Sequence, residues 1–152
     1  MNRTKYPLFI LITLILLALA ACGGAVASPP AGAIDLETET QQVPVDGGAY
    51  NDVSVEGLAA MLETKDFPLI NVHIPYEGEI EGTDEFVPFN EIESNLDKFP
   101  EDKDAQIVVY CRSGSMSTQA AKRLAELGYT NVMELDGGFR AWTAAGYSIA
   151  GQ

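Results

Sequence analysis

Residues 111–117 hold the side chains best suited to chemistry, because a cysteine is followed at once by an arginine and small polar residues. The segment reads Cys111-Arg112-Ser113-Gly114-Ser115-Met116-Ser117. An apolar run, 107–110, precedes it and an amphipathic stretch, 117–127, follows it, which predicts a buried strand, a short loop and a helix. Ligands of open α/β sheets bind at the carboxyl ends of strands, and Cys111 falls at such an end.

The predicted loop favours a negatively charged sulfur atom. A helix N-terminus presents unpaired N–H groups and a partial positive charge, and Gly114 with its small neighbours lets successive amides converge on one point. Such surroundings lower the pKa of a thiol without a partner histidine. We therefore predict Cys111 as a nucleophile. The alternative, an inert buried cysteine, gives no reason for the arginine and small polar residues beside it.

The rest of the domain must position this loop. Strands are predicted over 69–73, 107–110 and 132–135. Helices are predicted over 55–64 with Ser54 as N-cap, from the pair Asn90 and Glu93 to Lys98, over 117–127, and over 139–145. Their alternation indicates an α/β fold in which helices cover both faces of a mostly parallel sheet, within residues 51–152.

Composition excludes several classes of protein. The 152 residues include 9 Lys and Arg against 22 Asp and Glu, a net charge of -13, so a nucleic-acid partner is not expected. Two cysteines are too few for a disulfide scaffold, and a single histidine makes a histidine-rich metal site implausible. No metal and no cofactor are predicted.

The amino terminus has the pattern of an export signal. Arg3 and Lys5 precede an apolar run over 8–21, which is too short to span a bilayer. The run ends in Leu19-Ala20-Ala21-Cys22, which resembles a bacterial lipobox and predicts a signal peptide over 1–21 and lipidation of Cys22. Cleavage at a later small residue, near Ala27, is the alternative. We expect a lipid-anchored protein of the bacterial cell envelope, outside the cytoplasm, with a flexible tether over 22–50 that is rich in Gly and Pro.

Two motifs resemble the rhodanese-like sulfurtransferases. One is Cys111-Arg112-Ser113-Gly114 with Ser117, and the other is Leu135-Asp136-Gly137-Gly138-Phe139 followed by Trp142. The resemblance covers roughly 53–148 and implies a single rhodanese-like domain. It implies a persulfide on Cys111 that moves sulfur from thiosulfate, a persulfide or a polysulfide to a thiol or cyanide. The amides of 112–117 would bind the sulfur and Arg112 would steer the donor.

Other functions stay open beside this one. A non-catalytic module of the same family would bind a partner or sense reactive sulfur. A related phosphatase is disfavoured, because Ser117 stands where the Cys-x5-Arg motif requires arginine.

The chain departs from the family pattern at three places. Met116 stands where the family often has Arg or Thr, which weakens recognition of a doubly charged donor. Asn71 and His73 replace the usual Asp and Arg, which puts the support of the loop in doubt, and we expect His73 to be structural. The loop over 75–89 carries five acids, Glu77, Glu79, Glu81, Asp84 and Glu85. It is either a solvated loop or a rim that repels anions or binds a weak cation. Phe139 and Trp142 are predicted to be core residues.

Overall fold

The structure is a computed structural model that describes residues 34–151. The predicted signal peptide, the lipidation site Cys22 and the first part of the predicted tether lie outside the described residues. Within residues 34–151 no helix combines the length and the apolar character that crossing a membrane requires.

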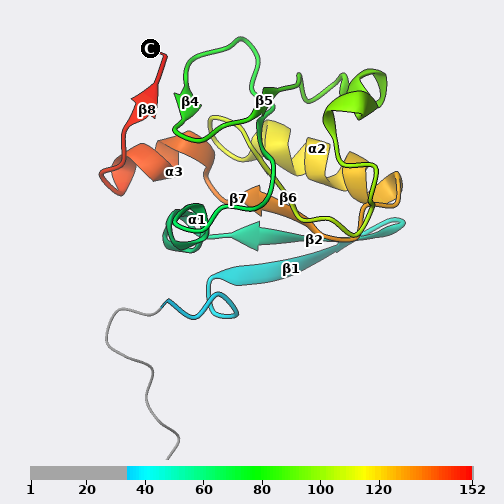
Figure 1. Cartoon of the computed structure of the whole chain (residues 1–152), viewed down its shortest axis with the longest axis horizontal. Helices are drawn as coiled ribbons and strands as arrows, with labels where there is room; N and C mark the ends of the chain where they lie inside the picture. Colours follow the sequence, from blue (N-terminus) through cyan, green and yellow to red (C-terminus); the bar gives the residue numbers. More distant parts are fainter. Residues whose placement is uncertain (1–33, 152) are drawn as a thin grey trace, which may run out of the picture. The chain divides into compact units, whose positions relative to one another are not determined.

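A six-stranded sheet forms the centre of the domain (Figure 1). Its order is β1-β2-β7-β6-β3-β5, and every neighbouring pair is parallel except β1 with β2. The strands are β1 (Thr40–Val45), β2 (Gly48–Val53), β7 (Val132–Leu135), β6 (Ile107–Tyr110), β3 (Leu69–Asn71) and β5 (Glu85–Phe86). Two short strands, β4 (Glu79–Ile80) and β8 (Ile149–Ala150), pair separately and antiparallel. The predicted α/β fold with a mostly parallel sheet is confirmed.

Helices cover both faces of the sheet. The helices α1 (Val55–Leu62) and α3 (Gly138–Ala144) pack on one face, and α2 (Ser115–Glu126) with the 3-10 helix η1 (Ile92–Lys98) covers the other. The side chains of β6 alternate between the two cores: Val109 packs toward α2, whereas Val108 and Tyr110 pack toward α1 and α3. All four residues of β6 are buried, as expected for a central parallel strand.

One of the two predicted caps is confirmed. The Ser54 hydroxyl accepts a hydrogen bond from the Gly57 N–H at 2.9 Å and starts α1, which ends two residues before the predicted position 64. The Asn90–Glu93 capping pair is wrong, because η1 begins after Glu91 without a side-chain cap. Asn95 leaves helical geometry there and donates to the Glu91 carbonyl, a local bond that competes with helix formation.

The predicted tether over 22–50 is wrong over its last part, because β1 and the start of β2 form a hairpin there. Asp46 and Gly47 make its two-residue turn, and Gly47 has a φ of +87°, a backbone conformation that favours glycine. Pro44 is accommodated because β1 is an edge strand. The Gly and Pro residues that suggested a tether therefore punctuate a hairpin.

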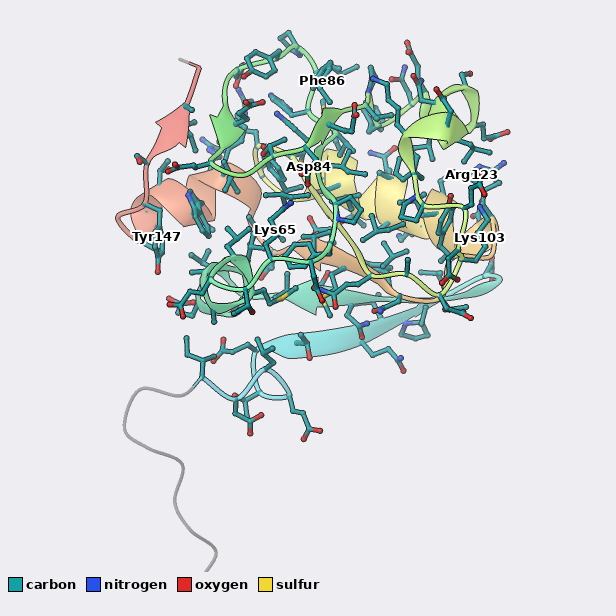
Figure 2. All side chains as sticks on the ribbon, viewed as in Figure 1. Lys65, Asp84, Phe86, Lys103, Arg123 and Tyr147 are labelled. Atoms are coloured by element: carbon teal, nitrogen blue, oxygen red, sulfur yellow. The ribbon has the colours of Figure 1, made fainter. Side chains whose placement is uncertain are left out.

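The acidic loop is anchored to the domain at several of its carboxylates. Asp84 accepts hydrogen bonds from the Lys65 ammonium and the Leu69 N–H, both at 2.7 Å, and Lys65 and Asp84 are labelled in Figure 2. Glu85 lies 3.4 Å from the Lys98 ammonium. No group of His, Cys, Asp and Glu within residues 34–151 is arranged to hold a metal ion, so the weak-cation alternative gains no support there.

Candidate active site around Cys111

Cys111 directly follows the buried strand β6, and α2 begins four residues later. The predicted strand, loop and helix are confirmed, although α2 starts at Ser115 rather than at Ser117. Gly114, with a φ of +90°, turns the chain into the helix. The cysteine side chain is only 1 % exposed, so the loop encloses it almost completely.

Hydrogen bonds converge on the Cys111 sulfur. The backbone N–H groups of Ser113, Met116 and Ser117 point at it, and the Ser117 hydroxyl lies 3.3 Å from Sγ. Burial acts to raise the pKa of the Cys111 thiol, but these hydrogen bonds together outweigh burial and hold the pKa below its ordinary value. The loop thus favours a thiolate, and the same donors suit any sulfur anion attached to Cys111.

The start of α3 fixes the backbone of this loop. The Phe139 N–H donates to the Cys111 carbonyl and the Arg140 N–H donates to the Arg112 carbonyl, both at 3.0 Å. The approach is close, because a Cβ added to Gly138 would lie 2.2 Å from the Cys111 carbonyl oxygen. Gly138 is therefore a packing requirement of the loop, whereas a Cβ at Gly137 would meet Ala141 within α3, at 2.8 Å.

Arg112 is held by an acidic side chain. Its Nη1 donates to the two carboxylate oxygens of Glu77 at 3.0 and 3.1 Å, and this bond is the main reason that the pKa of Glu77 lies below its usual value. The Arg112 side chain is 46 % exposed and projects at the surface, but its charge is matched by a neighbouring carboxylate. The steering role of Arg112 stays a prediction with a competing anion beside it.

Residues 54–145 match the family model of the rhodanese-like domain. The chain belongs to this family. A sulfurtransferase of Allochromatium vinosum is 35 % identical, over 65 % of this chain and 94 % of the relative. The thiosulfate sulfurtransferase GlpE of Shewanella oneidensis is 34 % identical, over 64 % of this chain and 96 % of the relative. The solved rhodanese-like domain of the Alr3790 protein from Anabaena is 25 % identical, with a TM-score of 0.58 over 66 % of this chain and 79 % of that domain.

Asn71 and His73, where the chain departs from the family pattern, make contacts with the segment 73–78 and with Phe139. The buried Asn71 side chain donates to the Gly78 carbonyl at 3.0 Å and accepts from the His73 N–H at 3.0 Å. The buried His73 ring lies edge-on to Phe139 and 3.3 Å from Glu77. An ionised aspartate at 71 could accept from the His73 N–H but could not donate to the Gly78 carbonyl, so the second bond depends on the amide of Asn71. Phe139 and Trp142 are core residues, as predicted. His73 is buried, and its structural role stays a prediction.

The remaining residues of the loop divide between backbone and side-chain roles. Ser113 and Ser115 are exposed, whereas the half-buried Met116 side chain packs against the core below α2. The backbone N–H of Met116 therefore points at the Cys111 sulfur, while its thioether side chain packs against the core. Ser117 is fully buried, and its hydroxyl touches Cys111.

Sequence reasoning missed Glu134, a buried acid in β7 that is hydrogen-bonded to the Ser117 hydroxyl. The available signal was a charged residue inside an otherwise apolar strand, directly before the Asp-Gly-Gly turn. A buried charge without a partner is costly, so such a position marks either an ion pair or a protonated acid.

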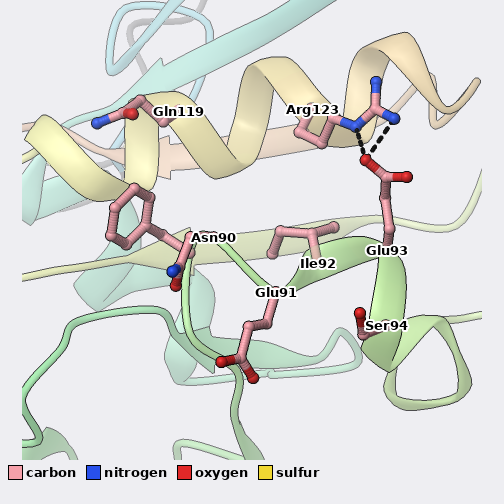
Figure 3. Close-up of a pocket in the computed structure, with 8 residues that line it drawn as sticks. Asn90, Glu91, Ile92, Glu93, Ser94, Gln119 and Arg123 are labelled. Carbon is pink, nitrogen blue, oxygen red and sulfur yellow. Dashed lines mark hydrogen bonds and ion pairs between the residues drawn. The ribbon is translucent and has the colours of Figure 1, made fainter.

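A separate hollow lies between the segment 89–94 and α2 (Figure 3). Its volume is about 510 Å³, and Cys111 is not among its eight lining residues. Its one lining cation, Arg123, donates to Glu93 and to Glu126, each at 2.7 Å. This hollow offers no thiol, and its one lining cation is already paired with two carboxylates.

Proposed function

We propose that this protein is a sulfurtransferase that carries sulfane sulfur as a persulfide on Cys111. The observation that carries the proposal is the set of four hydrogen-bond donors that surround the buried Cys111 sulfur. The sulfurtransferases among its relatives support the same reaction class.

The proposed cycle has two displacements at sulfur. The Cys111 thiolate attacks the outer sulfur of the donor, a new S–S bond forms, and the donor's own S–S bond breaks with its electron pair leaving on sulfite or on a thiolate. An acceptor thiolate or cyanide then attacks the outer sulfur of the persulfide, and Cys111 leaves as a thiolate. The loop amides face a negative sulfur before, during and after each displacement.

We expect persulfides and polysulfides to be better donors than thiosulfate. Thiosulfate carries two negative charges, while Arg112 is already paired with Glu77 and Met116 adds no charge. The whole sequence has a net charge of -13, which disfavours the approach of anions, most strongly at low salt.

The place of action is the second part of the proposal. A lipobox-like segment ending at Cys22 supports a lipid anchor in the bacterial cell envelope, with the domain outside the cytoplasm. The acceptor is then a small thiol or cyanide that reaches this compartment.

Intact mass spectrometry after incubation with polysulfide tests the reaction. The mass should rise by one sulfur atom, and peptide mapping should place that atom on Cys111. Cys111→Ser should not gain it, whereas Cys22→Ser, which removes the other cysteine, should gain it as the wild type does. A wild-type mass that stays unchanged would contradict sulfur transfer and favour a partner-binding module of the same family.

A further inference from the structure

The Ser117 hydroxyl has one proton and three acceptors around it. Its oxygen lies 3.3 Å from the Cys111 sulfur and 3.1 Å from the Gly114 carbonyl oxygen, and it is also hydrogen-bonded to the carboxyl group of Glu134. A hydroxyl donates once and accepts through its lone pairs. If Glu134 were ionised, its carboxylate would compete with the Cys111 thiolate for the single Ser117 proton.

The surroundings of Glu134 disfavour an ionised carboxylate. Glu134 is 2 % exposed, and none of the ion pairs within residues 34–151 includes it. Asp52 of β2 pairs in register with Glu134 of β7, and the two carboxyl groups are close enough to share a proton. The groups that face this cluster are Tyr50 and Asp52 from β2, Cys111 after β6, Ser117 from α2 and Asp136 after β7. Each of the acids and the thiol among them adds negative charge when it ionises.

We propose that Glu134 is a neutral carboxylic acid that donates to the Ser117 oxygen and so turns the Ser117 proton toward the Cys111 sulfur. Glu134 acts through Ser117, so it is a positioning residue rather than a catalytic one. The two hydrogen bonds run in one direction, from the acid through the hydroxyl to the thiolate, and no proton needs to be transferred. These two hydrogen bonds keep the Ser117 O–H directed at the sulfur, and the protonated Glu134 adds no second negative charge beside it.

The titration behaviour of the cluster agrees with this arrangement. Burial is the main cause that raises the pKa of Glu134 to about 9; the hydrogen bond with Ser117 acts to lower it, but burial and the charges of Asp52 and Cys111 outweigh that bond. Burial also raises the pKa of Asp52, although less, because Asp52 is half-exposed. Of two carboxyl groups that share one proton, the deeper one keeps it.

The test measures the ionisation of Cys111 in the full chain by the ultraviolet absorbance of its thiolate. In every background the matching Cys111→Ser protein is subtracted, which removes the contributions of Cys22 and the tyrosines. Glu134→Gln has nearly the same shape, cannot ionise and can still donate to Ser117. Glu134→Ala cannot donate. Ser117→Ala removes the connecting hydroxyl.

We expect Glu134→Gln to keep the wild-type pH midpoint of Cys111. Glu134→Ala should raise the midpoint by about half to one pH unit, the size of a modest hydrogen-bond effect, and should have no effect in a Ser117→Ala background. The infrared band of a protonated carboxylic acid should be present at neutral pH in the wild type, absent in Glu134→Gln, and lost in the wild type as the pH passes 9.

The opposite results overturn the proposal. A carboxylate hydrogen-bonded to the same hydroxyl as the sulfur raises the pKa of the thiol by on the order of two units at an effective dielectric constant of about 20, so an ionised Glu134 predicts a midpoint that falls by about that amount in Glu134→Gln. Any one of three results would refute the hydrogen-bond relay from Glu134 through Ser117 to Cys111: that fall, a missing infrared band, or an equal effect of Glu134→Ala with and without Ser117. The inference bears on turnover only through the proposed function. Since the titration needs no sulfur donor, its outcome is independent of the persulfide test.

Discussion

The substitution Gly138→Ala should displace the Cys111 loop, because the structure leaves no room for a side chain at that position. A Cβ there would lie 2.2 Å from the Cys111 carbonyl oxygen, 2.7 Å from the Arg112 carbonyl carbon and 2.8 Å from the Ser113 nitrogen. All three neighbours are backbone atoms, so no side chain can turn aside. The loop and the start of α3 must separate, which lengthens the hydrogen bonds that the Phe139 and Arg140 N–H groups donate.

A matched control separates this contact from backbone strain. Gly128 also has a positive φ, +90° against +58° for Gly138, but a Cβ there meets nothing within 4 Å. Gly128→Ala should therefore cost only the strain of left-handed backbone, about 1–2 kcal/mol of the free energy of unfolding. Gly138→Ala adds the cost of overpacking, about 1–3 kcal/mol, which gives about 2–5 kcal/mol in total.

Urea unfolding of both variants measures the difference in stability, and the thiolate absorbance of Cys111 reports on the loop itself. We expect the Cys111 midpoint to rise in Gly138→Ala, because a displaced loop loses its amide donors, and to stay at the wild-type value in Gly128→Ala. Equal losses of stability together with equal midpoints would refute the argument that α3 holds the loop through a contact only glycine permits.

Three further predictions follow from the same structure. Glu77→Gln frees Arg112 and should raise kcat/KM for thiosulfate about three- to tenfold at low salt, and by less at high salt. The control Glu81→Gln removes an exposed acid and should change kcat/KM less than twofold. Equal effects of the two substitutions in steady-state assays would exclude the ion pair as the cause. Glu134 retains in the folded state a proton that the unfolded chain loses at a pKa of 4.5. The free energy of unfolding should therefore fall as the pH rises from about 4.5 to 9, by up to about 1.4 kcal/mol per pH unit. Urea unfolding of Glu134→Gln should lack this pH-dependent component. Cys22→Ala should move the protein from the membrane fraction to the soluble fraction or leave it unprocessed, and a wild-type protein that is soluble with an unmodified Cys22 would contradict the anchor.

The sequence predicts the centre of the fold well because its signals there are local. The apolar run 107–110 has no polar face, so it specifies a strand buried on both sides, and the structure confirms this. The position of Cys111 at the end of that strand, and the glycine that turns into α2, follow from neighbouring residues alone. The same holds for Ser54, whose cap depends on a residue three positions along the chain.

Other features depend on partners that are distant in sequence. Arg112 is a free cation when its neighbours alone are considered, and only the fold brings Glu77 to it across 35 positions. The hairpin of β1 and β2 has a local signal in Asp46-Gly47, but Pro44 and the surrounding glycines are equally typical of an irregular segment. A proline is compatible with a strand only where that strand lies at an edge, and an edge is a property of the sheet order.

Glu134 depends most strongly on the assembled fold. Asp52, Ser117 and Glu134 come from β2, α2 and β7, and they meet only because β7 lies between β2 and β6, the strand that delivers Cys111. A thiolate and two carboxylates in this cluster would be three negative charges in partly dry surroundings, which is unfavourable without a cation. One proton relieves the repulsion, and the least exposed acid binds it most tightly. The loop amides therefore account for only part of the stabilisation of the Cys111 thiolate. The other part is that Glu134, one strand away, retains its proton and so does not repel the thiolate with a second negative charge.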